Sequence, residues 1–573
     1  MTTINWSLIR RNPRLFLYDV TLITIMAVLA ACGLIYQYLL SHYAGRVLGV
    51  MEHTIYAMIG VMIVSMGVGA FAARLVKCPF SGFAWLEAVI AFFGATGILL
   101  IAGAFALAAV APEVIARNFG LPPDLVPVGG VFRNLTAMAE VFPYLIGFII
   151  GMLVGMEIPF IARVREGVYG DHLEHNIGTL YGADYIGAGI GAAIFVAFML
   201  AASPEKAAIL TAAANLLAGL AFFFLSYRRI KFAAALFLVH LILGLVLVAL
   251  YAYAGDWHAT LEDTLYQDRV ILSRDTDFQH ITLTKRMISP ERPPIYTFYI
   301  NGRNQFSSGD EQIYHAMLVG PAMLASARRD NVLVVGGGDG LALRDVLTWS
   351  PRKVTVLELD REVVSLFKEP HEVDGAIINQ PLLDLNRNAF DDPRVRVTFG
   401  DAFNTVDGLI ADGHSFDVII VDLPDPSHPD LNKLYSIRFY AKLRQLLAGD
   451  GAMVIQSTSP YHARDAFLTV GVTLRQAGLD LVERYHQNVP SFGEWGWTIA
   501  TKAGARPSER IRRTAYDLPP GNWATKELLL ASFVFPARFL DGENLLEPNR
   551  LGSHIMYLLH QQAWQSQQDF RNE

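Results

Sequence analysis

A short glycine-rich segment, Val334–Val346 (VVGGGDGLALRDV), has the residue types of a nucleotide-binding turn. It joins an apolar run to an amphipathic one, and such strand–turn–helix units point backbone N–H groups at a bound ligand. Asp339 places a carboxylate directly after Gly338, within a run of glycines that begins at Gly336. A carboxylate in this position favours a ligand that is cationic where the usual ligand is anionic.

Two further carboxylates follow predicted strands of the same unit. Glu358 lies near the end of the run 354–359, 20 residues after Gly338, where an acidic residue commonly accepts hydrogen bonds from ribose hydroxyls. Asp401 follows the run 395–399, at a position where a carboxylate commonly accepts from an adenine amino group. These residues predict a nucleoside site.

A pair of acids follows the run 416–421. Asp422 ends this predicted strand, and Asp425 comes three residues later, before Pro426. A turn before proline explains Asp425 alone, but Asp422 needs no turn role. Ligands bind at the carboxyl edge of such sheets, so the pair predicts a cation site. Intact S-adenosylmethionine carries a carboxylate that Asp339 would repel, whereas its decarboxylated form presents an ammonium that Asp339 would attract.

The elements that position these residues form the second half of the chain. From about residue 260, β-rich runs alternate with amphipathic helical ones, which predicts an α/β Rossmann-like domain of the methyltransferase type. The predicted parts are a membrane domain (1–253), a small β-rich part (254–325), the Rossmann-like domain (326–540) and a helical tail (541–573).

The first half has a different composition. The 573 residues are 53% hydrophobic and 17% charged, with a net charge of −7. Apolar runs near 19–41, 54–73, 84–111, 139–162, 181–201, 207–227 and 232–253 are each long enough to cross a bilayer. We therefore predict about seven membrane-spanning helices. The two cysteines, Cys32 and Cys78, exclude a disulfide framework or a Cys-based metal site, and the acidic balance argues against nucleic acid.

Charges in the first half bear on orientation and function. Basic residues gather in alternate loops, at Arg10, Arg11, Arg14, Arg74, Lys77, Arg163, Arg165, Arg228, Arg229 and Lys231. Loops rich in Lys and Arg usually face the cytoplasm. This rule would put the N-terminus in the cytoplasm and, with seven spans, the C-terminal half outside. Ionisable groups also lie within or beside the spans, at Glu87, Glu140, Glu157, Asp184 and His240. Such groups are either paired structurally or functional, and an acidic set suits a cationic solute.

Several motifs resemble those of the spermidine synthases, or polyamine aminopropyltransferases. They are Gly336–Gly340 with Leu343–Asp345, Asp417–Asp422 with Asp425-Pro426, Asp277–Ile281, Asn301-Gly302 to Gln305, Asp310-Glu311 to Tyr314-His315, Val489–Trp497, and Trp523 to Phe533. The resemblance covers about residues 262–540, and the first half looks like the membrane-fused bacterial branch.

This resemblance implies transfer of an aminopropyl group from decarboxylated S-adenosylmethionine, as co-substrate, to putrescine or a related diamine. No metal or other cofactor is implied. Asp422 would be the base, and Asp339 would bind the donor amine. The nucleoside would be held by Gln279, Glu358 and Asp401, with Gly336 and Gly338 in the turn. The acceptor side would consist of Gln305, Tyr314, His315, Asp425 and Phe492, where Phe492 stands in place of a common tyrosine.

The same resemblance implies a multi-pass protein of the bacterial inner membrane that forms a homodimer or higher homo-oligomer. We expect the catalytic domain in the cytoplasm, where the donor is expected, despite the charge bias. Two alternatives stay open: a methyltransferase that uses intact S-adenosylmethionine, and a polyamine sensor or transporter without turnover. The exact acceptor and the role of the spans are also left open.

Overall fold

The computed structural model describes residues 13–48, 51–119, 130–169, 176–199, 202–373 and 375–570. The chain divides into two compact units, Met1–Val270 and Ile271–Glu573, which we call unit 1 and unit 2. Each unit has its own hydrophobic core. The units are described separately below.

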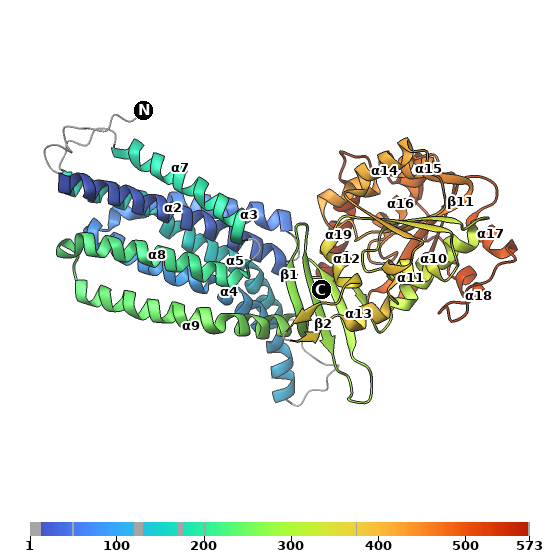
Figure 1. Ribbon diagram of the computed structural model, residues 1–573, viewed down its shortest axis with the longest axis horizontal. Coiled ribbons are helices and arrows are strands. Elements are labelled where there is room, and N and C mark those ends of the chain that lie inside the picture. The colour runs from blue at the N-terminus through green and yellow to red at the C-terminus, as the bar shows by residue number, and fades with distance from the viewer. Residues whose placement is uncertain are drawn as a thin grey trace. The chain divides into compact units, whose positions relative to one another are not determined.

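The described residues of unit 1 up to Tyr266 form helices joined by short connections (Figure 1). Its helices are α2 (Pro13–Leu48), α3 (Met51–Ala72), α4 (Pro79–Asn118), α5 (Val131–Gly155), α6 (Glu157–Tyr169), α7 (Asn176–Ile194), α8 (Pro204–Ser226) and α9 (Ala233–Tyr266), with short turns η1 (Ala73–Leu75), η3 (Phe195–Met199) and η4 (Tyr227–Arg229). Among the described residues, seven stretches are long and apolar enough to cross a membrane, and α5 and α6 count as one of them. Each predicted span has its helix, although α9 continues past the predicted end at 253.

Small residues let the helices of unit 1 approach closely. A Cβ atom on Gly69 of α3 would lie 1.8 Å from the carbonyl oxygen of Met152 in α5. On α7, a Cβ atom on Gly187 would lie 2.1 Å from the carbonyl oxygen of Ala27 in α2. Backbone contact at this distance requires glycine, and it is a common way of packing apolar helices in lipid.

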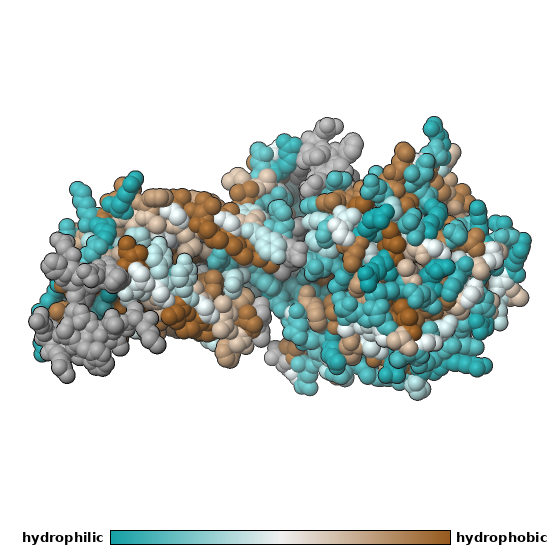
Figure 2. Space-filling model, turned by 90° about the horizontal axis from the view of Figure 1, so that it is seen from above, coloured by the Kyte–Doolittle hydropathy of each residue, from teal (hydrophilic) through white to brown (hydrophobic). Residues whose placement is uncertain are grey.

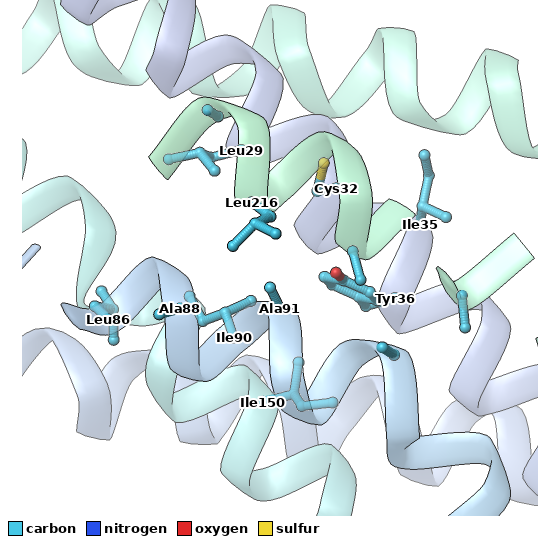
Figure 3. Close-up of a cluster of buried hydrophobic side chains, with 14 of the residues drawn as sticks. Leu29, Cys32, Ile35, Tyr36, Leu86, Ala88, Ile90, Ala91, Ile150 and Leu216 are labelled. Carbon is cyan, nitrogen blue, oxygen red and sulfur yellow. The ribbon is translucent and has the colours of Figure 1, made fainter. Parts of the chain in front are cut away.

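Apolar side chains occupy both the interior and the surface of unit 1. In the interior, Ile90, Ala91, Ile150 and Leu216 gather near the ring of Tyr36 (Figure 3). The outer surface carries large apolar side chains from every spanning stretch, such as Val64, Phe198, Phe224 and Val248. Figure 2 shows hydrophobic residues on the visible face of this unit. A water-facing bundle would bury such a surface, whereas a lipid-facing one exposes it.

Hydrogen bonds join three helix junctions at one end of unit 1. Arg163 of α6 donates to the carbonyl oxygen of Ala73, at the α3–α4 junction, over 3.0 Å. Arg229, at the α8–α9 junction, donates to the carbonyl oxygen of Gly167 in α6 over 3.2 Å. The basic loops therefore lie at the same end, which we call the basic end. Helix α9 starts there and finishes at Tyr266, at the other end of the bundle.

Unit 2 begins with a small antiparallel sheet. Its strands are β1 (Arg269–Asp275), β2 (His280–Arg286), β3 (Ile295–Ile300) and β4 (Arg303–Ser307), in the order β1-β2-β3-β4. The inward side chains of Ile281, Leu283, Phe298 and Phe306 pack into the main core of unit 2. The small sheet is thus continuous with the larger domain that follows it.

The rest of unit 2 is built on a seven-stranded sheet with the order β12-β13-β11-β10-β5-β6-β9. Its strands are β5 (Asn331–Gly336), β6 (Lys353–Glu358), β9 (Val395–Phe399), β10 (Phe416–Asp422), β11 (Leu447–Gln456), β12 (Leu481–Val489) and β13 (Gly493–Thr501). Strands β5, β6, β9, β10 and β11 run parallel. A short hairpin, β7 (Glu372–Val373) and β8 (Ala376–Ile377), lies outside this sheet.

Helices cover both faces of the sheet (Figure 1). They are α10 (Glu311–Ala325), α11 (Leu341–Leu347), α12 (Arg361–Lys368), α13 (Gln380–Leu385), α14 (Ala402–Ala411), α15 (Ile437–Leu446), α16 (Arg464–Gln476), α17 (Pro507–Arg513), α18 (Lys526–Ala531) and α19 (Ile555–Phe570), with 3-10 turns η5 (Ala389–Asp391), η6 (Pro429–Tyr435) and η7 (Glu543–Leu545). Alternate residues of β5 face opposite layers, since Val332 and Val334 join the core with α10 and α11, whereas Leu333 and Val335 join the core with α15 and α16. The predicted Rossmann-like fold is confirmed.

Candidate active site

The glycine turn between β5 and α11 lies against the end of β10. Gly336 and Gly337 have φ angles of 82° and 67°, which glycine adopts readily. A Cβ atom on Gly336 would lie 2.0 Å from the carbonyl oxygen of Asp422, and the N–H of Gly337 donates to that oxygen over 3.1 Å. The turn and the strand end that carries Asp422 are therefore locked together through the backbone.

Asp339 lies inside this turn. Its Oδ1 accepts a hydrogen bond from the N–H of Leu341 over 2.9 Å, and Asn386 donates to its backbone carbonyl over 3.1 Å. Burial raises the pKa of the Asp339 carboxyl, while the charge of His315 and the Leu341 hydrogen bond act in the opposite direction. The carboxylate that the sequence places among the glycines is thus half-buried and is held by a hydrogen bond from the backbone.

We call the three acids Asp339, Asp422 and Asp425 the acidic crevice, and Asp422 receives a hydrogen bond from helix α10. The hydroxyl of Tyr314, on α10, donates to Asp422 Oδ1 over 2.8 Å. Burial and the charge of Asp339 raise the pKa of Asp422 to about 6, although His315 and the Tyr314 hydrogen bond lower it. Asp422 is therefore ionised at neutral pH and can accept a proton.

A buried ionic network lies behind Tyr314. Glu311 accepts hydrogen bonds from Arg344 at 2.8 and 3.0 Å, and Nδ1 of His315 lies 2.9 Å from Glu311 Oε2. Burial lowers the pKa of His315, but the Glu311 hydrogen bond and the surrounding carboxylates outweigh it and raise that pKa to about 9. Burial raises the pKa of Glu311, and its two cationic partners lower it to about 2. His315 is thus a buried imidazolium that faces Glu311.

The predicted nucleoside-binding residues lie at the ends of β6 and β2. A Cβ atom on Gly338 would lie 3.0 Å from the Glu358 carboxyl group, so Glu358 borders the turn directly. Gln279 donates to Asp360 Oδ2 over 3.1 Å, and Thr276 donates to the same oxygen over 2.6 Å. Asp360 therefore ties the segment with Gln279 to the loop that carries Glu358. Burial raises the pKa of Glu358 to about 7, although hydrogen bonds from two backbone N–H groups act to lower it.

Asp401 follows β9 and caps α14, where it accepts from the N–H of Phe403 over 2.9 Å. Its Oδ2 also pairs with Lys433 over 2.6 Å. Because the N–H of Gly400 donates to the carbonyl oxygen of Glu358 over 2.9 Å, Asp401 and Glu358 stand at adjacent strand ends. Glu358 and Asp401 thus lie along one edge of the seven-stranded sheet, and Asp360 connects Gln279 to the same edge.

Asp425 lies at the far end of the acidic crevice. Its carboxylate accepts from Gln456 over 3.3 Å and from Thr458 over 3.2 Å, and His560 Nε2 on α19 lies 3.2 Å from Oδ2. Arg303 is close enough to interact electrostatically with Asp425. The carboxylate is 14% exposed, so part of it still faces the crevice.

Two other predicted acceptor residues have different surroundings. The ring of Phe492 lies edge-on to Tyr314, with centroids 5.9 Å apart, and so lines the side of the crevice near Asp422. Gln305 turns its amide back to its own strand, where it donates to the carbonyl oxygen of Arg303 over 3.1 Å. His315 is 2% exposed and faces Glu311, so it is placed behind the crevice.

Sequence reasoning missed several residues that hold the site. They contact the predicted site residues directly or through one partner, and they are Asp360, Thr276, Lys433, Gln456, Thr458, His560 and Arg344. Arg344, Asp360 and Thr276 lie within or next to motifs that the sequence analysis quoted, although their contacts had no signal there. Lys433, Gln456, Thr458 and His560 come from other segments and had no local signal.

The glycine turn, the acids at the strand ends and the Tyr314–Asp422 hydrogen bond lie together in unit 2. Residues 311–510 match the family model of the spermine/spermidine synthase domain. The chain is 52% identical over 550 residues to the polyamine aminopropyltransferase of Shewanella oneidensis, with 96% of each chain covered. It is 33% identical to polyamine aminopropyltransferase 1 of Streptomyces coelicolor, with 88% of each covered.

Among solved structures, a crystal structure of spermidine synthase in complex with the transition state analogue AdoDATO has 25% sequence identity and a TM-score of 0.40. It covers 48% of this chain and 89% of that one. On the identities over nearly the whole length, the chain belongs to the polyamine aminopropyltransferases, a family of transferases in polyamine biosynthesis.

Proposed function

We propose that the enzyme transfers the aminopropyl group of decarboxylated S-adenosylmethionine to putrescine, giving spermidine and methylthioadenosine. The observation that carries this proposal is the acidic crevice, in which Asp339 and Asp422 interact electrostatically across the turn and Tyr314 holds Asp422. A donor with an ammonium group and no carboxylate complements Asp339. A diamine acceptor complements Asp422 and Asp425 in the same way.

In the proposed reaction, the acceptor nitrogen attacks the aminopropyl carbon bonded to sulfur. The new C–N bond forms as the C–S bond breaks. The electron pair of the C–S bond goes to sulfur, which becomes the thioether of methylthioadenosine. The proton from nitrogen goes to Asp422, directly or through water. A sulfonium is already a good leaving group, so the chemistry requires position and a base but no metal or other cofactor.

The surroundings of the other site residues support distinct roles. We assign the nucleoside to Gln279, Glu358 and Asp401, and the distal ammonium of the acceptor to Asp425. Phe492 and Tyr314 form the wall beside the reacting amine. His315 acts through Glu311 as a positioning residue, because its imidazole is buried in the network behind Tyr314.

The two alternatives differ in the charge that they need. Intact S-adenosylmethionine would bring a carboxylate toward Asp339, which disfavours a methyltransferase. A polyamine sensor would need the acids that bind the amine but no base held by a tyrosine. The Tyr314–Asp422 hydrogen bond therefore favours turnover over binding alone.

The direct test is a donor and acceptor panel. We expect purified protein to release methylthioadenosine from decarboxylated S-adenosylmethionine in the presence of putrescine, read by mass spectrometry. Intact S-adenosylmethionine should give no transfer product. Methylated amines from the intact donor would overturn the proposal in favour of a methyltransferase.

Replacing Asp339 with asparagine should weaken the binding of the decarboxylated donor, since charge-assisted hydrogen bonds are roughly twice as strong as neutral ones. The intact donor, whose carboxylate Asp339 repels, should lose less affinity or gain some. Isothermal titration with both donors measures the difference, and Asp345→Asn, on the neighbouring helix, is the matched control. Equal losses for both donors would show that Asp339 only shapes the turn.

We propose further that the seven apolar stretches of unit 1 cross the bacterial inner membrane. Their length and their outward apolar side chains support this placement. We propose unit 2 in the cytoplasm because its donor is expected there, although the basic end of unit 1 favours the opposite orientation. Homo-oligomerisation stays a prediction, and the mass of the solubilised protein tests it.

A reporter pair fused after Glu573 decides the orientation. A cytoplasm-active fluorescent protein should be bright at this position, and a phosphatase that is active only in the periplasm should be inactive. The same reporters fused after Tyr169 are the internal control, since the last turn of α6 belongs to the basic end and should give the opposite result. An active phosphatase after Glu573 would place the catalytic unit outside.

A further inference from the structure

Unit 1 contains a group of polar side chains deep among its apolar ones. Glu87 of α4, Glu157 of α6, Asn215 of α8, His240 of α9 and Tyr36 of α2 are all at most 1% exposed. We call these five residues the interior acceptor cluster. They come from five helices, so the fold of the whole unit brings them together.

Contacts within the interior acceptor cluster join α4, α8 and α9. Asn215 donates to Glu87 Oε2 over 2.9 Å and to the Glu87 carbonyl oxygen over 3.1 Å. A Cβ atom on Gly219 of α8 would lie 2.9 Å from Glu87 Cβ and 3.2 Å from His240 Nε2, so both side chains face this glycine. The His240 Nδ1 lies 2.9 Å from the carbonyl oxygen of Leu236, which assigns the proton to Nδ1 and leaves Nε2 as an acceptor.

The remaining two members approach from α6 and α2. Glu157 lies close enough to interact electrostatically with Glu87 and with the half-buried Asp184 of α7. Tyr36 interacts in the same way with Glu87 and Glu157. A Cβ atom on Gly94 would lie 2.5 Å from the Tyr36 hydroxyl oxygen, so this glycine makes room for the phenol against α4 (Figure 3).

The unpaired atoms of this cluster have one chemistry in common. Among the described residues, none donates a hydrogen bond to Glu87 Oε1, to either carboxylate oxygen of Glu157, to Asn215 Oδ1 or to His240 Nε2, and the Tyr36 hydroxyl has no partner. Apart from that hydroxyl, every one of these atoms is an acceptor. The buried Arg165 of the same unit is committed to Asp19, at 2.7 and 3.0 Å.

Burying these unpaired acceptors in an apolar interior is unfavourable in free energy unless a cationic donor binds them. Buried polar groups are normally hydrogen-bonded, and buried charges are normally paired. Within the described part of the chain, no three His, Cys, Asp or Glu side chains are placed to hold a metal ion. The complementary ligand is therefore an organic cation with several N–H donors, and a primary ammonium has three.

We propose that the interior acceptor cluster of unit 1 binds the primary ammonium group of an aliphatic amine. Glu157 and Glu87 provide the charge, and Asn215 and His240 provide further acceptors. This is a second amine site, separate from the acidic crevice of unit 2, and it gives unit 1 a role in binding amines within the membrane. An ammonium ion without N–H groups can neutralise the charge of the site but cannot donate hydrogen bonds to its acceptors.

The test uses full-length protein in lipid nanodiscs and equilibrium dialysis with radiolabelled putrescine. We expect two amine sites per chain in the wild type. Glu157→Gln should weaken one of them by about 30-fold or more, as expected when one partner of a buried charge pair is removed. Asp425→Asn should weaken the other. Glu166→Gln, an exposed acid on the same helix α6, is the matched control and should keep both.

Transferase turnover is measured on the same samples, so that a failure of the second amine site can be distinguished from a failure of the proposed function. Glu157→Gln should retain wild-type turnover in detergent, which also reports its folding. Should this variant not fold, the wild type provides the readout: infrared carboxylate bands should shift when putrescine binds and not when tetramethylammonium is added. A single amine site in the wild type, lost in Asp425→Asn, would overturn the proposal, as would equal displacement by tetramethylammonium.

Discussion

Asp422→Asn is expected to lower kcat by about 10²–10⁴-fold, the usual contribution of a general base. The acceptor amine is protonated near neutral pH and cannot attack until it loses a proton. Asparagine keeps the shape of the side chain and a possible partner for the Tyr314 hydroxyl, but it cannot take the proton. Donor affinity should stay near the wild-type value, because the role proposed for Asp422 is toward the acceptor and not toward the nucleoside. Rapid-quench turnover and titration with the donor measure the two effects.

The pH profile provides an independent check of the same residue. Because burial and Asp339 raise the pKa of Asp422 to about 6, the wild-type kcat should fall as the pH drops through about 6 and protonates the base. This acid limb should be absent in Asp422→Asn. Asp425→Asn is the matched control and should raise the acceptor KM more than it lowers kcat. If Asp422→Asn keeps most of its turnover at saturating diamine, the base lies elsewhere, and Tyr314 is the next candidate.

Glu311→Gln is expected to lower the local free energy of unfolding around α10 by about 3–5 kcal/mol, the usual effect of breaking a buried ion pair. The change leaves two buried cations, His315 and Arg344, facing a neutral amide. Native-state hydrogen exchange of peptides covering α10 and β5 measures the loss. Glu362→Gln, which breaks the exposed pair with Arg274 at 3.4 Å, is the control and should change stability by less than about 1 kcal/mol.

The same network sets a pH window. The pKa of His315 is raised to about 9, so its contribution is complete below its unfolded value of about 6.5 and is lost as the pH rises through 9. The pKa of Glu311 is lowered to about 2, so its contribution is complete above its unfolded value and is lost as the pH falls through 2. Protection of α10 should therefore fall between about pH 6.5 and 9. Unchanged protection in this range would show that His315 is neutral.

Much of the fold follows from local patterns in the sequence. The runs at 354–359, 395–399 and 416–421 became β6, β9 and β10 with almost the same limits. The two inner strands of these, β6 and β10, are largely buried, and buried parallel strands are rich in apolar residues. The glycine turn needs three positive φ angles, which the sequence supplies at Gly336, Gly337 and Gly340. Strand ends in a parallel sheet share one edge, so the acids Glu358, Asp401 and Asp422 could be placed together in advance.

The partners of these acids could not be predicted from the sequence. Lys433, which pairs with Asp401, lies in the 3-10 turn η6, and His560, which meets Asp425, lies on α19 at the C-terminal end. No spacing rule links residues 32 or 135 positions apart. Their encounter depends on how η6 and α19 pack against α15 and α16, which is a property of the folded core. For His315, the sequence indicated the acceptor side, whereas packing turns its imidazole toward Glu311.

The contact between Gly336 and the Asp422 carbonyl oxygen has a consequence for how the enzyme can diversify. It holds the glycine turn one interstrand step, about 4.8 Å, from the backbone of β10, whatever side chains surround it. We therefore expect substitutions around the turn to leave the spacing between the proposed donor site and the proposed base unchanged. At the other end, Arg303, Thr458 and His560 reach Asp425 from three separate segments. On the roles proposed here, exchanging these side chains would change which amine is accepted without disturbing the turn.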